Sequence, residues 1–275
     1  AKDTGEGNDT ASGSDSAAGN STVSGNNAAQ EKEDDAAGGM PQEEPPYGEN
    51  RPEPLRGSTE EDYLSHISAD IYGDAGVQKA AEYPFVTVDE SYFDDALFIG
   101  DSRTDTLKMY AGWENTTYYV KTGTNIWDIM DVVPDDEDRT IDETLQNKQF
   151  GKVYIMLGVN ELGTGTAETY YQQFKKVVTR IRELQPNALI FVESIIHVSA
   201  EKDAEGTVIN NTEINARNKW LKKLADNKTI FYLDYNEVLD DENGALKADS
   251  TFDGVHLKAD KIEPWKQFIL SHGVK

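Results

Sequence analysis

Residues 96–103 read Ala96-Leu97-Phe98-Ile99-Gly100-Asp101-Ser102-Arg103, and a helical segment is expected to continue from them to Tyr110. Four apolar residues in a row that end at a glycine-containing turn are typical of a buried strand. A helix that follows this turn directly places the serine near the free N–H groups of a helix N-terminus. The stretch therefore predicts a strand-turn-helix unit of an α/β fold, with a polar side chain at the turn.

Four further short apolar runs follow, over residues 117–120, 153–157, 188–192 and 229–233. They lack strict alternation, which is typical of strands buried on both faces of a parallel sheet. Segments of helical period separate the runs. We expect these helices over residues 167–184, about 212–225 and about 259–270. This alternation predicts a three-layer α/β/α sandwich with a parallel five-stranded sheet and right-handed crossovers.

The composition changes sharply before the predicted sheet. Residues 1–57 are mostly Gly, Ser, Ala, Asn, Asp, Glu and Pro, and they hold too little apolar surface to offset the entropy of ordering. We expect a disordered acidic tether there. Residues 58–93 are interpreted as an N-terminal lead-in that packs on the domain, with a short helix at 59–64 and an extended stretch at 85–89. One folded domain is expected over residues 94–275.

The net charge is −25, from 51 Asp and Glu residues against 26 Lys and Arg residues. Nucleic acid is therefore not an expected partner, and neither is an anionic membrane surface, because both need a basic face. The absence of cysteine excludes disulfides, thiolate metal sites and cysteine nucleophiles. The acidic run 135–138 lacks the glycine-centred spacing of a calcium loop, and we interpret it as a solvated turn that holds no ion.

No apolar run in the sequence approaches the length of a membrane span. The chain begins Ala1-Lys2-Asp3 without a methionine, and we expect an export signal, with or without a lipid-anchored cysteine, to precede these residues. Residues 1–57 would then tether an extracellular or cell-surface protein, whose only membrane contact is that anchor. The alternative is a disordered acidic leader on a cytosolic protein. The oligomeric state is not predicted by any feature of the sequence.

Polar residues and glycines follow the predicted strands, at the edge where functional groups of open α/β sheets collect. Ser102 follows the first strand. Asn160 follows the third strand and can direct its side-chain NH₂ into the crevice as an oxyanion donor, while Gly158 permits close backbone approach. The N–H of Gly123, after the second strand, is a candidate third donor. Taken alone, Asn160 also fits a simple turn residue, and Gly123 a glycine required by backbone geometry.

The segment before the last predicted helix contains Asp253 and His256, three positions apart on a bend. A carboxylate beside an imidazole can hold one ring nitrogen and fix the tautomer. The other nitrogen is then free to take a proton from a serine hydroxyl. The alternative interpretation is a common Asp-Gly turn with a surface histidine, and for Ser102 it is a helix-capping serine.

Together these pieces resemble the SGNH, or GDSL-like, hydrolase family. The resemblance covers roughly residues 94–275 and rests on ordered blocks at the strand ends. The matching residues are Gly100, Asp101, Ser102, Gly123, Gly158, Asn160, Asp253 and His256.

The resemblance implies a flavodoxin-like sheet with strand order 2-1-3-4-5 and hydrolysis through an acyl-enzyme intermediate. The catalytic residues would be Ser102, His256 and Asp253. The oxyanion hole would consist of the N–H of Ser102, the N–H of Gly123 and the side chain of Asn160. Members of the family need no metal or organic cofactor, and none is expected here.

Five residues are further candidates for the substrate pocket: Asp101, Arg103, Gly158, Glu161 and His197. Arg103 stands where the family label has leucine, and pairing with a neighbouring carboxylate is favoured over contact with a substrate. Asp101 is expected to brace its turn by accepting backbone hydrogen bonds. His197 is expected to be a loop residue more than a ligand.

The predicted function is that of a serine esterase that removes an acyl group, such as acetyl, from an extracellular glycan or a small ester. One alternative is a lysophospholipase or thioesterase on longer acyl chains. Another is a surface glycan-binding module on the same fold without catalysis. Intact Ser102, Asn160, Asp253 and His256 favour the enzyme over the binding module.

Overall fold

The computed structural model describes residues 85–275. The expected tether over residues 1–57 and the expected helix at 59–64 lie outside these residues. Within the lead-in, Val86 pairs in antiparallel fashion with Gly273, and the N–H of Val88 donates to the carbonyl of Leu270 at 2.8 Å. The part of the lead-in that is described therefore packs on the end of the chain.

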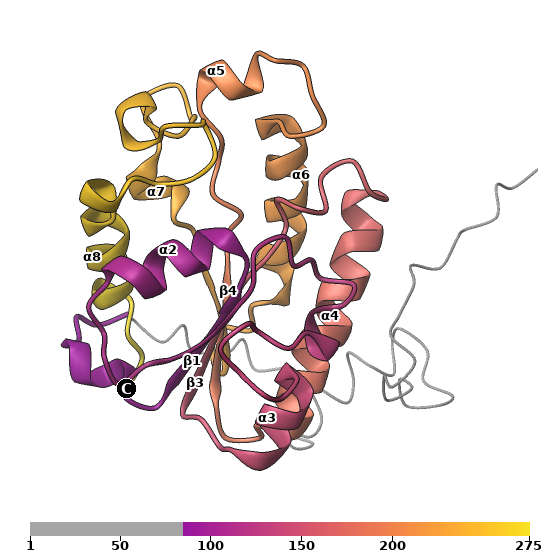
Figure 1. Cartoon of the computed structure of the whole chain (residues 1–275), viewed down its shortest axis with the longest axis vertical. Coiled ribbons are helices and arrows are strands. Elements are labelled where there is room, and N and C mark those ends of the chain that lie inside the picture. The colour runs from indigo at the N-terminus through magenta and orange to yellow at the C-terminus, as the bar shows by residue number, and fades with distance from the viewer. Residues whose placement is uncertain (1–84) are drawn as a thin grey trace, which may run out of the picture. The chain divides into compact units, whose positions relative to one another are not determined.

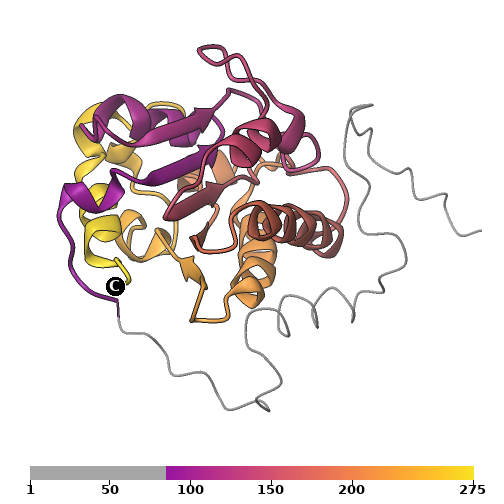
Figure 2. The same cartoon turned by 90° about the horizontal axis from the view of Figure 1, so that it is seen from below.

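Five parallel strands form one sheet in the order β2-β1-β3-β4-β5, as the resemblance implied (Figures 1 and 2). Each predicted strand is present with bounds shifted by at most one residue. The strands are β1 (Ala96–Gly100), β2 (Thr117–Val120), β3 (Lys152–Met156), β4 (Leu189–Glu193) and β5 (Ile230–Leu233). Their buried apolar residues occupy both faces of the sheet, which explains why the sequence runs do not alternate.

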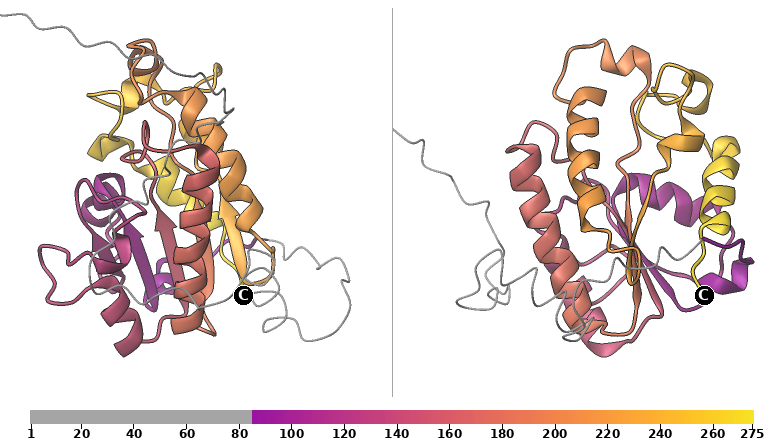
Figure 3. Two further views of the ribbon diagram at one scale, coloured as in Figure 1. Left: turned by 90° about the vertical axis from the view of Figure 1, so that its right-hand side faces the viewer. Right: turned by 180° about the vertical axis from the view of Figure 1, so that it is seen from behind.

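Helices cover both faces, so the three-layer sandwich is confirmed (Figure 3). They are α2 (Ser102–Tyr110), α3 (Ile141–Asn147), α4 (Ala167–Leu184), α5 (Ala200–Asp203), α6 (Asn211–Leu221), α7 (Asn236–Leu239) and α8 (Glu263–Ser271). Short 3₁₀ turns are η1 (Glu90–Phe93), η2 (Ile129–Asp131), η3 (Lys222–Leu224), η4 (Ala248–Ser250) and η5 (Ala259–Lys261).

The bounds of α4 are as predicted, but two other helices differ from the sequence expectation. The helix expected over 212–225 ends as α6 at Leu221 and continues only as the 3₁₀ turn η3. The helix expected over 259–270 is divided into η5 and α8, and Pro264 lies in the first turn of α8. Proline fits a first turn because its missing N–H has no partner there, so α8 starts where the proline favours a start.

Two apolar cores lie on the two faces of the sheet. One face packs against α3, α4 and α6, and the other against α2, α7 and α8. On the second face Phe98, Tyr154 and Phe191 stand in register on β1, β3 and β4, with successive ring centroids 4.3 Å apart. This aromatic stack holds the three central strands together below the edge where the polar loops meet.

No helix within residues 85–275 is both long enough and apolar enough to cross a membrane.

Candidate active site

Ser102 is the first residue of α2, directly after β1. Asp101 caps this helix by accepting a hydrogen bond from the N–H of Arg103 at 2.9 Å, as the sequence predicted. The turn is tight, because a Cβ on Gly100 would overlap the side chain of Thr104 and the carbonyl of Met156. The close approach of α2 to β3 therefore fixes where the serine hydroxyl emerges.

The structure brings Ser102, His256 and Asp253 together in one hydrogen-bonded line. The Oγ of Ser102 lies 2.8 Å from Nε2 of His256, a residue 154 positions later in the chain. The Nδ1 of the same ring lies 2.7 Å from Oδ2 of Asp253. The other carboxylate oxygen of Asp253 accepts hydrogen bonds from the N–H groups of Val255 and His256. A carboxylate on Nδ1 leaves Nε2 as the acceptor for a hydroxyl proton.

The ionisation of Asp253 suits this arrangement. Burial opposes its charge, but the hydrogen bonds from the main chain and ring of His256 outweigh burial and lower the pKa of Asp253 to about 2. The carboxylate is therefore charged at any pH near neutrality. It can stabilise an imidazolium that forms when the histidine takes a proton.

Asn160 lies beside the turn of Ser102, where an oxyanion donor is needed. Its Nδ2 lies 2.8 Å from the carbonyl of Thr124 and 3.3 Å from Oδ2 of Asp101. The first contact brings the loop of Gly123, which has a φ of +78°, next to Asn160. To bind a developing oxyanion, the amide would exchange its longer contact, that with Asp101, for the substrate oxygen.

Gly158 lets the main chain after β3 pass close to neighbouring side chains, where a residue with a Cβ would not fit. Its φ is +142°, and a Cβ would overlap the side chain of Ile195 and lie 2.9 Å from the hydroxyl of Tyr170. The main chain after β3 therefore runs against the segment after β4.

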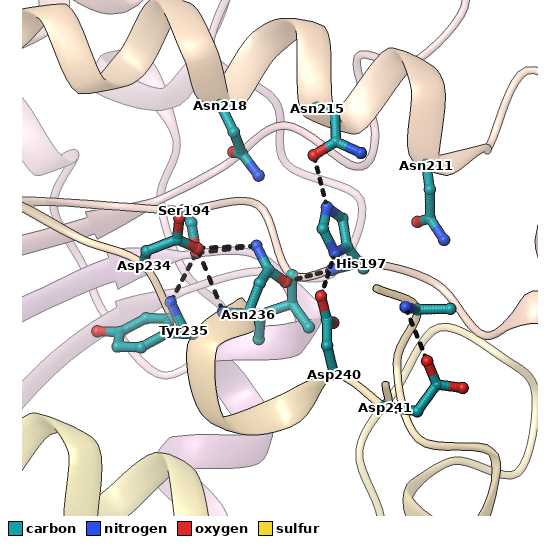
Figure 4. A network of polar contacts seen from close by, with 12 residues as sticks. Ser194, His197, Asn211, Asn215, Asn218, Asp234, Tyr235, Asn236, Asp240 and Asp241 are labelled. Atoms are coloured by element: carbon teal, nitrogen blue, oxygen red, sulfur yellow. Dashed lines mark hydrogen bonds and ion pairs between the residues drawn. The ribbon is translucent and has the colours of Figure 1, made fainter. Parts of the chain in front are cut away.

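Three asparagine side chains hold the extended segment that follows β4, which we call the clamped segment (residues 195–198). Figure 4 shows the contributing side chains. Asn218 accepts from the N–H of Ile195 and donates to its carbonyl, both at 2.8 Å. Asn211 does the same to Val198, at 2.8 and 2.9 Å. Asn236, from α7, accepts from the N–H of His197 at 2.8 Å. The amides thus replace the neighbouring strand that this buried backbone lacks.

His197 adds two side-chain contacts to the same segment. Its Nδ1 lies 2.7 Å from Oδ2 of Asp240 and its Nε2 lies 3.0 Å from Oδ1 of Asn215, and only 7% of the residue is exposed. Burial alone would lower the pKa of His197, but the hydrogen bond and charge of Asp240 outweigh it and raise the pKa. Two acceptors on one ring are both satisfied when the imidazole is protonated.

The clamped segment supports the loop that carries Asp253 and His256. The N–H of Ser199, the residue directly after the clamped segment, donates to the carbonyl of Gly254 at 2.9 Å. Gly254 has a φ of +82°, and a Cβ there would overlap the side chains of Ser199 and Lys202. On the other side, Nη1 of Arg103 donates to the carbonyl of Ile196 at 2.5 Å. The segment therefore links the helix that bears the serine with the loop that bears the histidine.

The remaining candidates for the pocket are buried. Arg103 is 3% exposed, and burial lowers its pKa to about 10 although Asp101 and Asp253 oppose this. Glu161 accepts from the N–H of Ile126 at 2.5 Å, and burial raises its pKa to about 8. Asp101, Arg103, Glu161 and His197 thus contact groups of this chain.

Sequence reasoning missed two features of the site. The first is the asparagine set, which carries a signal in the spacing of Asn211, Asn215 and Asn218 along one side of a helix. The second is Phe252, an aromatic residue directly before Asp253 that is 73% exposed. Its place beside the candidate catalytic pair makes it a candidate for ligand contact. Within residues 85–275, no group of three or more His, Asp or Glu side chains is arranged to hold a metal ion.

The five-stranded parallel α/β fold and the family that the sequence matches are those of a carboxylic ester hydrolase. Residues 98–260 match the GDSL-like Lipase/Acylhydrolase family, and the chain belongs to this family. The resemblance to the GDSL-like hydrolase family is thus confirmed.

Several solved structures are similar to this chain. A GDSL-like lipase from Bacteroides thetaiotaomicron VPI-5482 is 15% identical, with 76% of this chain and 95% of that chain covered and a TM-score of 0.47. A carbohydrate esterase family 3 protein from Talaromyces cellulolyticus is 17% identical, with 63% and 93% covered and a TM-score of 0.42. An acetyl xylan esterase is 19% identical, with 63% and 98% covered and a TM-score of 0.43. Among curated proteins, none matches this chain.

Proposed function

We propose that this chain is a serine esterase that deacylates, and in particular deacetylates, an extracellular glycan or a small ester. The observation that carries the proposal is the hydrogen-bonded line from the Oγ of Ser102 through the ring of His256 to Asp253. An alcohol, an imidazole and a carboxylate in this order are the parts needed for nucleophilic attack on a carbonyl.

In the proposed reaction, the Oγ of Ser102 attacks the ester carbonyl carbon while Nε2 of His256 takes its proton. The resulting oxyanion is bound by the N–H of Ser102, the side chain of Asn160 and the N–H of Gly123. The imidazolium then gives its proton to the leaving alkoxide, and an acyl-serine remains. Water, deprotonated by the same nitrogen, then attacks the acyl carbon, and the nitrogen returns the proton to Oγ of Ser102 as the acyl–Oγ bond breaks and the carboxylic acid leaves. Asp253 keeps the ring oriented throughout and stabilises its charge.

Two observations support a glycan or small ester over a lipid. Of the six large apolar side chains that are exposed within residues 85–275, only Met109 and Tyr110 are adjacent in the sequence, and the others are Phe85, Val133, Val208 and Phe252. A pocket for a long acyl chain needs contiguous apolar surface, because each buried methylene contributes about 0.8 kcal/mol. The composition of residues 1–57 supports a tether, and with it a place outside the cell.

The test measures hydrolysis of p-nitrophenyl esters from acetate to dodecanoate, together with labelling by a fluorophosphonate. The intact protein should hydrolyse the acetate and be labelled, and Ser102→Ala should lose both. Ser91→Ala, an exposed serine on η1, is the matched control and should keep both. Labelling without a preference for short chains would favour the lysophospholipase or thioesterase alternative. No turnover of any ester and no labelling would favour the binding module and overturn the proposal.

A further inference from the structure

Phe252 presents a large aromatic face to solvent beside the proposed general base. Its ring centroid lies 6.4 Å from that of His256, and the two ring planes differ by only 15°. The side chain is 73% exposed, although burying a phenylalanine would contribute about 1.5–3 kcal/mol. Folding stability therefore does not account for an aromatic residue at this position.

The backbone on both sides of Phe252 is held in place. Thr251 is buried, pairs with Leu257 across the loop, and accepts a hydrogen bond at its Oγ1 from the N–H of Gly254 at 2.9 Å. Gly254 is in turn bound to Ser199 through its carbonyl. The exposed ring is thus carried by a backbone that these contacts hold beside His256.

The chemistry of the proposed reaction places one half of the substrate at this ring. His256 must deliver its proton from Nε2 to the oxygen of the leaving alcohol, so that oxygen has to come within hydrogen-bond reach of Nε2. The carbonyl oxygen points instead to the donors at Ser102 and Asn160. The alcohol half of the ester therefore leaves the site on the side of the imidazole, where Phe252 lies.

The surroundings of Phe252 favour a ring-shaped polar alcohol. The exposed polar residues of the loop from η4 to His256 are Asp249 and Asp253, which flank Phe252 in the sequence, and none of the other exposed large apolar residues belongs to this loop. An isolated flat apolar face with polar neighbours fits a pyranose, which has an apolar face of C–H groups and an edge of hydroxyls. A flexible hydrocarbon would need a wider apolar surface.

We infer that Phe252 determines specificity for the alcohol half of the ester, as an aromatic platform on which the sugar ring of an acylated glycan stacks. This inference rests on the proposed function, since it assigns the leaving-group side from the roles of Ser102 and His256. Phe252 contacts the substrate, and it takes no part in proton transfer.

The test compares two acetate esters with the same acyl half, a monoacetylated methyl xylopyranoside and ethyl acetate. The ratio of kcat/KM for the sugar ester to kcat/KM for ethyl acetate should fall at least tenfold in Phe252→Ala and should be largely restored in Phe252→Trp. Tyr110→Ala, which removes an exposed aromatic residue at the far end of α2, is the matched control and should leave the ratio unchanged. The rate of deacylation should be the same for both esters because they share one acetyl-enzyme.

Three results would overturn the inference while the proposed function stands. The first is an equal loss on both esters in Phe252→Ala, which would make the residue a support of the loop. The second is a change in acyl-chain preference, which would place the ring on the acyl side. The third is a larger loss on octyl acetate than on the sugar ester. Failure of the proposed function is seen separately, as an intact protein that neither turns over any ester nor reacts with the fluorophosphonate.

Discussion

His256 donates to Asp253 twice, once from the ring Nδ1 at 2.7 Å and once from its own main-chain N–H at 2.8 Å, and the two bonds reach different carboxylate oxygens. The main-chain bond fixes the carboxylate relative to the residue whose ring it orients. A spacing of three residues on one bend is enough to build this pair, which explains why the sequence pattern predicts it.

Asp253→Asn separates the charge of this carboxylate from its role in the loop. The Oδ1 contacts to the N–H groups of Val255 and His256 can remain, but the amide NH₂ would face Nδ1 as a donor and favour the wrong tautomer. We expect kcat on p-nitrophenyl acetate to fall by roughly 10³–10⁴-fold, with the midpoint of thermal unfolding little changed. An activity within tenfold of the intact protein would mean that Ser102 and His256 act as a pair without Asp253.

Asn160→Ala tests the oxyanion site. Removing one donor from such a site typically lowers kcat by about 10²–10³-fold, because the lost bond forms mainly in the transition state. We expect this loss in kcat with a smaller change in KM, measured on p-nitrophenyl acetate. Asn147→Ala, an exposed asparagine at the end of α3, is the matched control. A change in KM without a loss in kcat would show that Asn160 only holds the Thr124 loop.

The sheet and the three proposed catalytic residues could be predicted because their signals are local. Strands buried on both faces appear as apolar runs; Ser102 stands at the end of the first run, and Asp253 and His256 stand three positions apart on one bend. The expected end of α6 was wrong by a few residues because Lys222, Lys223 and Leu224 form a 3₁₀ turn, which has nearly the same sequence preferences as a helix.

The asparagine contacts could not be predicted in this way. A polar stripe along a helix indicates a solvated face, yet Asn211 and Asn218 are buried against a backbone segment that only the tertiary fold brings near. Likewise, an apolar residue such as Phe252 indicates core, and its exposure depends on a loop conformation. Both features lie in the parts of the chain that we propose position the site or contact the substrate, where local preference is overridden most often.

Asn218→Ala tests the clamped segment. The substitution leaves the buried N–H of Ile195 without its acceptor, while the carbonyl keeps its bond from Asn236 at 3.1 Å. An orphaned buried donor costs about 1–3 kcal/mol, and we expect the free energy of unfolding in urea to fall by this amount. Lys219→Ala, at the exposed neighbouring position of α6, is the control and should change it by less than about 0.5 kcal/mol. Equal losses of unfolding free energy in the two variants would contradict the inference that Asn218 stabilises the clamped segment.

Glu193→Gln should change how stability depends on pH. Burial raises the pKa of Glu193 from an ordinary 4.5 to about 8, although the hydroxyl of Tyr235, which donates to its carboxyl group, opposes this. Between these two values the folded chain keeps a proton that the unfolded chain releases, so stability falls as pH rises through this window. Glutamine keeps the acceptor for Tyr235 and has no proton to lose. We expect the free energy of unfolding of the variant to match that of the intact protein near pH 4.5 and to exceed it by on the order of 3 kcal/mol at pH 7, measured by urea unfolding.

Part of the dependence of stability on pH should persist in the variant, because burial raises the pKa of Glu161 to about 8 as well. Glu242→Gln, at an exposed loop position, should leave the slope unchanged, and a Glu193→Gln curve parallel to that of the intact protein would show that Glu193 is ionised in the fold.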